Sequence, residues 1–222
     1  MTDSQNNLKL QQTPDGSYTL LRTDMGETYH SRHGALTESK HVFIKNGLDL
    51  VNIQGTIHVL EVGLGTLLNA YLAAQFAQEN KKQLLYYGIE KYPVPLPLLK
   101  RPAMEWDSNQ EQYKNLVESD WEKEITLNPF FTIKKIEADA LSYQAKHSID
   151  IIFFDAFAPN YQGEMWDKAY FEELYNQLNP GGILTTYCAK GSVRRDLASV
   201  GFSMERKPGP PGKREMLVGT KP

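Results

Sequence analysis

The chain has 222 residues, of which 41% are apolar and 23% charged, and this length allows one α/β domain with a well-buried core. Its single cysteine, Cys188, excludes an intramolecular disulfide and fits a reducing compartment. No apolar run approaches the roughly 20 residues that a membrane-spanning helix needs, and the polar N-terminus lacks the apolar stretch of a signal peptide, so we expect a soluble, cytoplasmic protein.

Charge is distributed unevenly along the chain. The net charge of −3 does not indicate a nucleic-acid-binding protein, but from Lys190 onward there are eight basic residues and three acidic ones. Because a polyanion responds to local potential, this basic tail is a candidate contact for a nucleic acid. An ordinary solvated surface explains the same pattern, and charge alone does not separate the two interpretations.

The first part of the chain predicts a small extension that precedes the main domain. We assign residues 1–48 to this N-terminal extension and residues 49–222 to the main domain. The extension is expected to contain a weakly held start, two short strands and a helix, at residues 1–13, 17–24, 27–31 and 33–48.

The rest of the chain alternates strand patterns with helix patterns. Strands are expected at residues 57–63, 83–90, 130–138, 149–157 and 182–189, and a closing hairpin at 202–207 and 214–220. Helices are expected at residues 67–80, 165–178 and 192–200, with two more within 93–128, the second of which carries Tyr113, Leu116, Val117 and Trp121 on one face. A mostly parallel sheet with a C-terminal antiparallel hairpin is typical of a Rossmann-like, class I methyltransferase. A dehydrogenase would normally continue with parallel strands.

An acidic residue stands at the end of four successive predicted strands. These residues are Glu61, Glu90, Asp139 and Asp155. In an open α/β sheet, ligands bind outside the carboxyl ends of the strands. The sequence therefore predicts a pocket with a polar rim, suited to a ligand that is rich in hydroxyl and amino groups.

Two glycines, Gly63 and Gly65, directly follow the first of these acids. Glycines let the backbone approach a ligand closely, and the following helix terminus can hold a carboxylate. Leu67 stands where a third glycine would complete the glycine pattern of a nucleotide-binding loop, so a simple tight turn remains an alternative interpretation. Together with the Asn-Pro-Gly-Gly segment at residues 179–182, which also reads as a plain helix stop and turn, the loop predicts a pocket for S-adenosylmethionine (SAM).

Three of the four acids each suggest a role in such a pocket. Glu90 is placed to accept hydrogen bonds from the ribose hydroxyls, a position also expected for an NAD-binding acid, and a solvent-facing acid is the alternative. Asp139 is assigned, together with Ala140, to the adenine end of the cofactor. Alternatively, Asp139 serves only as the N-cap of the following turn. Asp155 follows the most apolar strand, where burial raises its pKa and cations lower it. It would hold the acceptor amine and help it lose a proton, unless it only anchors its loop.

The histidines and the single cysteine do not form a metal-ligand spacing, so no metal is predicted. Tyr29 and His33 are candidates to cover the pocket, and the sequence leaves this open.

Four segments of the chain are similar to one known family. They are YHSRHGALTESKHVFIKNGL, IEKYP, DAFAPNYQGEMWDKAYFEELYNQLNPGGILTTY and SVRRDLASVGFSMERKPGPPGKREMLVGT. They resemble the methyltransferase domain of the bacterial tRNA wobble-modification enzyme MnmC, which is called MnmD when it is free-standing. The resemblance implies that SAM methylates the primary amine of 5-aminomethyl-(2-thio)uridine at the tRNA wobble position, giving 5-methylaminomethyl-(2-thio)uridine.

Glu61, Gly63, Glu90, Asp139 and Asp155 match motifs of that family, in which Asp155 corresponds to the acid beside the reacting amine. Two positions depart from the family pattern: Leu67 stands where a glycine is common, and residues 187–190 lack the usual small residues. Bifunctional members add a flavin-dependent oxidase domain that 222 residues are too few to include, so the resemblance implies the methyl-transfer step alone.

Four residues of the basic tail are expected to grip the tRNA backbone. They are Arg194, Arg195, Lys213 and Arg214. Two other kinds of function remain alternatives: a small-molecule amine N-methyltransferase or aminopropyltransferase-like enzyme, and a non-catalytic SAM-binding or RNA-binding module. The basic tail argues against a free polyamine as substrate, because like charges repel.

Overall fold

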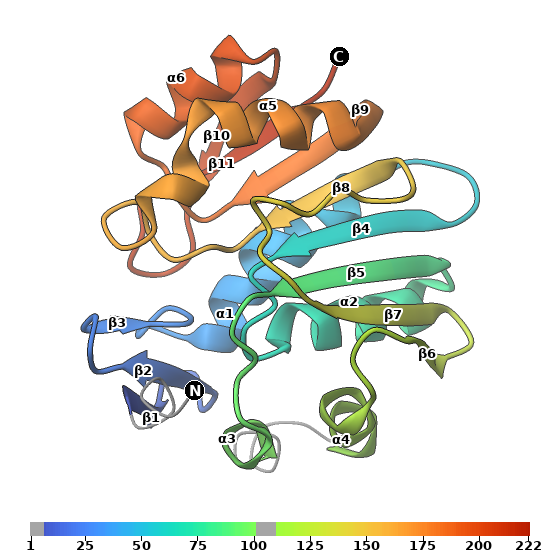
Figure 1. Cartoon of the computed structure of the whole chain (residues 1–222), viewed down its shortest axis with the longest axis vertical. Coiled ribbons are helices and arrows are strands. Elements are labelled where there is room, and N and C mark those ends of the chain that lie inside the picture. Colours follow the sequence, from blue (N-terminus) through green and yellow to red (C-terminus); the bar gives the residue numbers. More distant parts are fainter. Residues whose placement is uncertain (1–6, 101–109) are drawn as a thin grey trace.

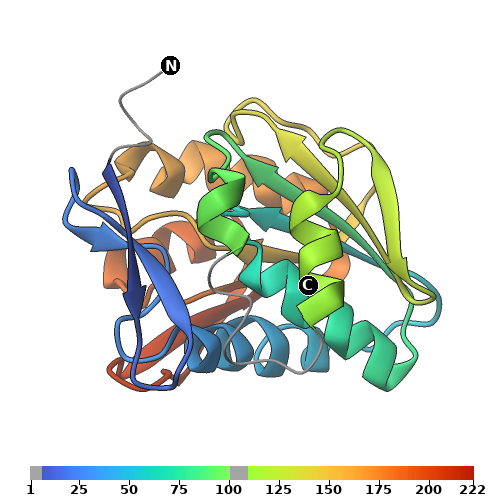
Figure 2. The same cartoon turned by 90° about the horizontal axis from the view of Figure 1, so that it is seen from below.

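The computed structural model describes residues 7–100 and 110–222. An eight-stranded sheet with helices on both faces forms the main body, and a separate three-stranded sheet lies beside the carboxyl ends of its parallel strands (Figures 1 and 2). The expected α/β fold with a mostly parallel sheet is confirmed. Within the described ranges, no helix combines the length and apolar character that crossing a bilayer requires.

The main sheet has the strand order β10-β11-β9-β8-β4-β5-β7-β6. Its parallel strands are β4 (Ile57–Val62), β5 (Leu84–Glu90), β7 (Phe131–Glu137), β8 (Ile149–Phe154) and β9 (Leu178–Thr186). Its antiparallel strands are β6 (Glu124–Asn128), β10 (Ser203–Pro208) and β11 (Glu215–Thr220). The chain runs outward from β4 to β5 and β7 and then returns to β8 on the other side of β4. This reversal opens a crevice at the carboxyl ends of β4 and β8, where ligands bind in such sheets.

Helices cover the two faces of the sheet and close two apolar cores (Figure 1). One face carries α1 (Ala35–Ser39), η2 (Lys40–Lys45), α2 (Leu68–Asn80) and α4 (Gln110–Glu118). The other carries η5 (Gly163–Trp166), α5 (Lys168–Gln177) and α6 (Gly191–Ser199). The short elements η3 (Leu48–Leu50) and α3 (Leu96–Lys100) complete the set. Strand β8 is buried along its whole length, as its unbroken apolar run predicts.

The N-terminal extension is packed into the main domain. The predicted helix spans α1 and the π-helical η2, whose Val42 and Phe43 are fully buried in the main core. The Thr185 hydroxyl on β9 donates a hydrogen bond to the Val42 carbonyl oxygen (3.0 Å). The division into an extension and a main domain stays a prediction, because these residues share one core.

The first residues were expected to be weakly held, and from Leu8 onward this is wrong. Strand β1 (Leu8–Gln12) pairs antiparallel with β2 (Tyr18–Arg22) along its whole length, and β3 (Glu27–Thr28) completes the small sheet. Leu8 and Leu10 alternate with polar residues and pack against the main core, which is the period-two pattern of a half-buried strand. Residues 1–6 lie outside the described residues.

Three further expectations need correction. Residues 93–128 contain strand β6 in addition to α3 and α4, and β6 forms a hairpin with β7. Trp121 lies beyond α4, where it bridges to Lys135 on β7 instead of extending the apolar face of the helix. Residues 179–182 do not stand before strand β9 as a turn but lie within it, and the register shift between Ile149 and Ile151 accommodates them.

Candidate active site

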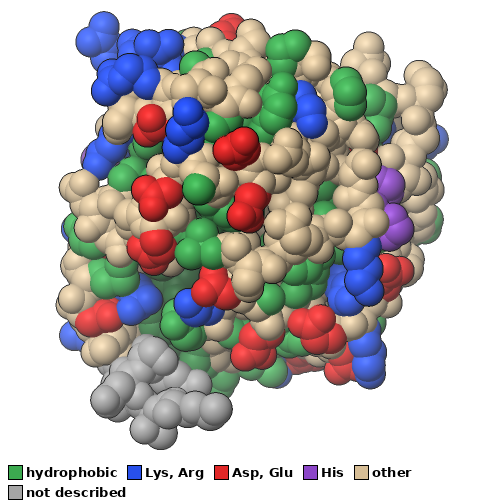
Figure 3. Space-filling view, turned by 45° about the horizontal axis from the view of Figure 1, so that its top comes forward, with side chains coloured by type: hydrophobic (Ala, Val, Ile, Leu, Met, Phe, Trp, Pro, Cys, Tyr) green, Lys and Arg blue, Asp and Glu red, His purple; other side chains and the backbone are tan. Residues whose placement is uncertain are grey.

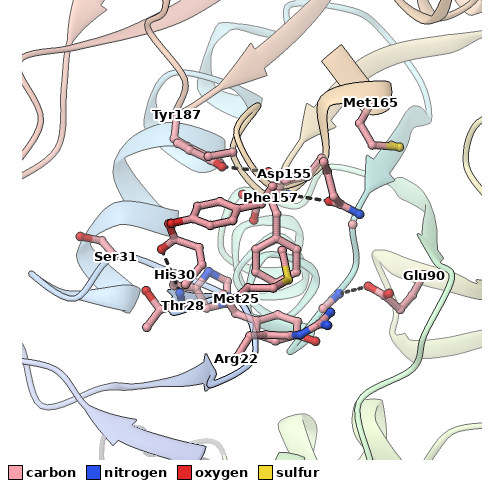
Figure 4. Close-up of a pocket in the computed structure, with 18 of the residues that line it drawn as sticks. Arg22, Met25, Thr28, His30, Ser31, Glu90, Asp155, Phe157, Met165 and Tyr187 are labelled. Atoms are coloured by element: carbon pink, nitrogen blue, oxygen red, sulfur yellow. Dashed lines mark hydrogen bonds between the residues drawn. The ribbon is translucent and has the colours of Figure 1, made fainter. Parts of the chain in front are cut away.

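A cavity of about 640 Å³ opens at the carboxyl edge of the sheet (Figure 4). It is lined by the N-terminal extension, the glycine loop after β4, the ends of β5 and β7, the segment from the end of β8 into η5, Tyr187 after β9, and the loop between β10 and β11. This volume lies within the range of cavities that hold small-molecule ligands. Only Tyr29 and His33 of the extension were candidates to cover the pocket from sequence, yet the extension supplies a whole wall, which includes both of them.

The glycine loop is shaped by contacts that leave no room for side chains. Gly63 has a φ of 90°, and a Cβ on it would lie 2.7 Å from the Asp155 carbonyl oxygen. Gly65 has a φ of 50°, and its Cβ would lie 3.0 Å from Cδ1 of Tyr29. Both glycines line the cavity, so bare backbone faces the ligand there.

Leu67 adopts a backbone conformation that glycine favours. Its φ of 64° and ψ of 13° are left-handed, a conformation that an L-residue other than glycine adopts at a cost of about 1–2 kcal/mol. Its side chain is 1% exposed and belongs to the main core. Burial of a leucine contributes roughly 1.5–3 kcal/mol, which offsets the strain. Leu67 therefore holds the left-handed conformation that ends the loop at the start of α2.

Glu90 and Asp139 stand at the outer end of the cavity. Glu90 accepts hydrogen bonds from the backbone N–H groups of Gly65 (3.0 Å) and Tyr92 (2.9 Å), while burial raises its pKa above the ordinary value. Asp139 accepts a hydrogen bond from the Lys91 ammonium (2.7 Å), and this bond lowers the pKa of Asp139. The cavity wall also includes Ala140.

Asp155 stands at the inner end, directly after β8. It accepts a hydrogen bond from the side-chain amide of Asn69 (2.8 Å). Burial raises the pKa of Asp155 to about 7, and the negative charge of Glu38 acts in the same direction. The Asn69 hydrogen bond and the positive charge of Lys213 oppose this rise. A carboxyl group with such a pKa exchanges a proton readily near neutral pH.

Lys213 lies in the cavity and not on the outer surface, contrary to its assignment as a surface contact for tRNA. Its ammonium is 2.6 Å from a Glu38 carboxylate oxygen and 3.8 Å from the centre of the Tyr187 ring. The Tyr187 hydroxyl donates to the Ala156 carbonyl oxygen (2.9 Å), beside Asp155. Sequence reasoning missed Glu38 and Tyr187, although both lie in segments that resemble the MnmC family.

Glu61 was expected in the cavity wall, and this is wrong. Its side chain is fully buried, with one carboxylate oxygen 2.8 Å from the Asn69 amide nitrogen and the other 2.7 Å from the Tyr86 hydroxyl. Burial raises its pKa well above the ordinary value. The reason is strand alternation: Glu61 lies inside β4 and points to the sheet face that α2 covers.

Aromatic and basic residues of the extension form the wall opposite the sheet. The rings of Tyr29 and Phe157 meet edge to face at 5.0 Å, and the Arg22 guanidinium lies 5.9 Å from the Phe157 ring centre. Figure 4 shows Phe157 near the middle of the cavity, with Arg22 and Met25 along one side and Glu90 at one end.

The other basic residues assigned to tRNA lie outside the cavity. Arg195 on α6 and Arg214 in the β10–β11 loop are exposed, whereas Arg194 is half-buried and its Nε has no hydrogen-bond partner among the described residues. Figure 3 shows Lys and Arg side chains gathered at its upper left, the side on which α6 lies in Figure 1. Within residues 7–100 and 110–222, no three His, Cys, Asp or Glu side chains are grouped so as to hold a metal ion.

A profile of the S-adenosyl-L-methionine-dependent methyltransferases matches residues 102–222, more than half of the chain. The chain belongs to this family. S-adenosyl-L-methionine is therefore the cofactor of this methyltransferase, and the cavity at the carboxyl edge offers the donors and acceptors that such a ligand needs: bare glycine backbone, the Glu90 carboxylate and the Asp139 carboxylate.

The names of individual relatives are more specific than the description of the family. The chain is 32% identical over 218 residues to the tRNA 5-methylaminomethyl-2-thiouridine biosynthesis bifunctional protein MnmC of Leptospira interrogans, covering 91% of this chain and 34% of that protein. It is also 32% identical over 216 residues to the protein of the same name from Stutzerimonas stutzeri, covering 87% and 32%. The methyltransferase thus spans about a third of the length of these curated relatives.

Two solved structures share the fold of this chain. The crystal structure of MNMC2 from Aquifex aeolicus superposes with a TM-score of 0.82 and 25% identity, covering 97% of this chain and 71% of that one. Spermidine synthase from Thermotoga maritima, at a TM-score of 0.57 and 10% identity, shares the fold.

Proposed function

We propose that this methyltransferase transfers a methyl group to the primary amine of 5-aminomethyl-(2-thio)uridine at the wobble position of tRNA, giving 5-methylaminomethyl-(2-thio)uridine. The names of the MnmC relatives and the likeness to MNMC2 support this substrate. The observation that carries the proposal is Asp155, whose carboxyl group lines the cavity directly after β8 and accepts a hydrogen bond from the Asn69 amide (2.8 Å), with its pKa raised to about 7 by burial. A tRNA substrate implies a cytoplasmic location.

The outer end of the cavity is assigned to the cofactor. Glu90 would accept hydrogen bonds from the ribose hydroxyls, and the backbone of Gly63 and Gly65 would face the amino-acid part. Asp139 and Ala140 would flank the adenine. When bound, the cofactor supplies an electrophilic methyl group on a sulfonium. The chain must hold this group in line with the attacking nitrogen and keep water away.

Asp155 prepares the acceptor. An alkylamine is mostly protonated near neutral pH, and only the neutral form has the lone pair that attacks a methyl group. The Asp155 carboxylate, in its ionised form, holds the ammonium and accepts its proton; the pKa of about 7 keeps both protonation states of Asp155 accessible. The Lys213 ammonium, paired with Glu38, acts on Asp155 in the opposite direction to burial: its positive charge lowers the pKa of Asp155 and so favours the ionised form.

The tRNA would approach over the rim formed by α6 and the β10–β11 loop. Arg195 and Arg214 are exposed there, and no ion pair is found for either among the described residues. Free guanidinium groups suit phosphate oxygens, which they bind in a bidentate manner.

The deciding experiment is a methyl-transfer assay with nucleoside mass spectrometry. Purified protein, SAM and tRNA that carries 5-aminomethyl-2-thiouridine should produce 5-methylaminomethyl-2-thiouridine. The control tRNA has an unmodified wobble uridine and should gain no methyl group. Binding of SAM without methyl transfer to the modified tRNA would reject the proposal, and transfer to a free small amine instead would reassign the substrate.

A further inference from the structure

Asn69, the second residue of α2, joins two carboxyl groups through one amide. Its Nδ2 atom lies 2.8 Å from Oε1 of Glu61 and 2.8 Å from Oδ2 of Asp155. The side chain is 1% exposed. An amide nitrogen carries two hydrogens, so one is available for each carboxyl group.

Glu61 and Tyr86 hold the Asn69 amide in this orientation. The second oxygen of Glu61 accepts a hydrogen bond from the Tyr86 hydroxyl (2.7 Å), and both Glu61 and Tyr86 are fully buried. The Oδ1 atom of Asn69, by contrast, is buried with no hydrogen-bond partner among the described residues. The contacts that fix the amide therefore all pass through its nitrogen, towards the two acids.

We propose that Asn69 is a positioning residue that holds one oxygen of Asp155 and leaves the other for the acceptor amine, with Glu61 and Tyr86 anchoring Asn69. This inference rests on the proposed function, in which Asp155 meets the amine. It also gives Glu61 a role, because Glu61 does not reach the cavity and acts on Asp155 through Asn69.

The effect of Asn69 on the pKa of Asp155 distinguishes this positioning role from simple packing. An N–H donor stabilises the ionised form of the carboxyl group that it contacts, so Asn69 lowers the pKa of Asp155 against the effect of burial. The other charged or titratable groups that interact electrostatically with Asp155 come from α1, β4, β5, the segment after β9 and the β10–β11 loop. They are Glu38, Glu61, Tyr86, Tyr187 and Lys213. Because the same amide lowers the pKa of both acids, loss of the donor should raise the pKa of Asp155 and also that of Glu61.

The test is a carbon-13 NMR titration of the aspartate carboxyl groups in the full chain, with Asp155→Asn used to identify the Asp155 signal. Asn69→Leu has a similar size and no donor, and we expect it to raise the pKa of Asp155 by about one to two units. Asn69→Ser, a milder variant, should shift it in the same direction by less. Asn80→Leu, an exposed asparagine on the same helix, is the matched control and should cause no shift.

A second readout is the pH dependence of single-turnover methyl transfer. The acid limb in Asn69→Leu should move to higher pH by the same amount, with SAM affinity unchanged. An unshifted Asp155 titration in folded Asn69→Leu or Asn69→Ser protein would overturn the inference, even if the wild type methylates tRNA. A shifted titration in a protein without methyl transfer would keep the coupling and reject the proposed function instead.

Discussion

The two ends of the cavity use the same kind of residue in different ways. At the outer end, Glu90 accepts hydrogen bonds from backbone N–H groups and Asp139 is paired with Lys91, whose ammonium lowers its pKa. At the inner end, Asp155 is fixed by a side-chain amide, faces a second acid in Glu38, and has a pKa raised to about 7. Position at a strand end brings each acid to the site, but burial and partners decide whether it binds a ligand or moves a proton.

The sharpest way to break this comparison is Asp155→Asn, which keeps the size of the side chain and removes its ability to take a proton. Turnover on aminomethyl-bearing tRNA should fall by about 100-fold or more, the usual scale for a positioned acid–base group. Calorimetry should show SAM affinity nearly unchanged. Near-normal turnover in a single-turnover assay would remove Asp155 from the chemistry.

Glu90→Ala should act mainly on SAM affinity, whereas Asp155→Asn acts mainly on turnover. It removes a charged acceptor for two hydrogen bonds, each worth about 1.5–3 kcal/mol, so SAM affinity should fall at least about tenfold. Asp139→Ala is the matched comparison. Because Lys91 already pairs with that carboxylate at a half-exposed site, its loss should weaken SAM binding by less. If calorimetry finds equal losses, or none for Glu90→Ala, the assignment of the outer end is wrong.

The pH dependence of folding stability is a third test, and its direction follows from the raised pKa of Asp155. Asp155 has an ordinary pKa of 3.8 and a folded-state pKa of about 7, so protonation favours the folded chain. That stability is complete below about pH 4 and is lost as the pH rises through 7. Asp155→Asn, which carries no charge, should therefore melt at nearly the wild-type temperature at pH 4 and several degrees, about 2–8 °C, above it at pH 8. A difference that does not grow with pH would contradict the raised pKa.

The smallest expected effect concerns the rim outside the cavity. Replacing Arg195 and Arg214 with alanine should weaken tRNA binding and flatten the slope of log affinity against log salt by roughly 1.5, because each lost phosphate contact contributes about 0.7–0.9. Lys213 is not suitable for this test, since Glu38 holds it inside the cavity.

The matched control for the rim is Lys123→Ala, an exposed lysine paired with Asp120 beside β6 at the far edge of the sheet. It should leave the salt slope unchanged. An unchanged slope in the arginine variant as well would mean that the tRNA is held by another surface.

Most of the sheet could be predicted from local patterns, and the failures have physical causes. Strand β6 was missed because it lies in a segment read for its helices, and its pairing with β7 is a contact that periodicity does not encode. Strand β1 was missed because its two leucines are half-buried only through packing on the main core. Glu61 was placed in the cavity because an acid at the end of a strand was expected to face the ligand, but strand alternation directs its side chain towards α2, where Asn69 contacts it.

The sequence by itself determined the α/β fold class and the edge of the sheet at which the site lies, because periodicity is local and parallel strands bring their carboxyl ends to one edge. The tertiary structure decided which side chains meet there. Glu38 and Lys213 lie 175 positions apart, and only the packing of the extension against the C-terminal hairpin brings their charges to 2.6 Å. The contrast between Asp155 and Glu90 arises in the same way, since burial and hydrogen-bond partners are properties of the folded chain and set the pKa of each acid.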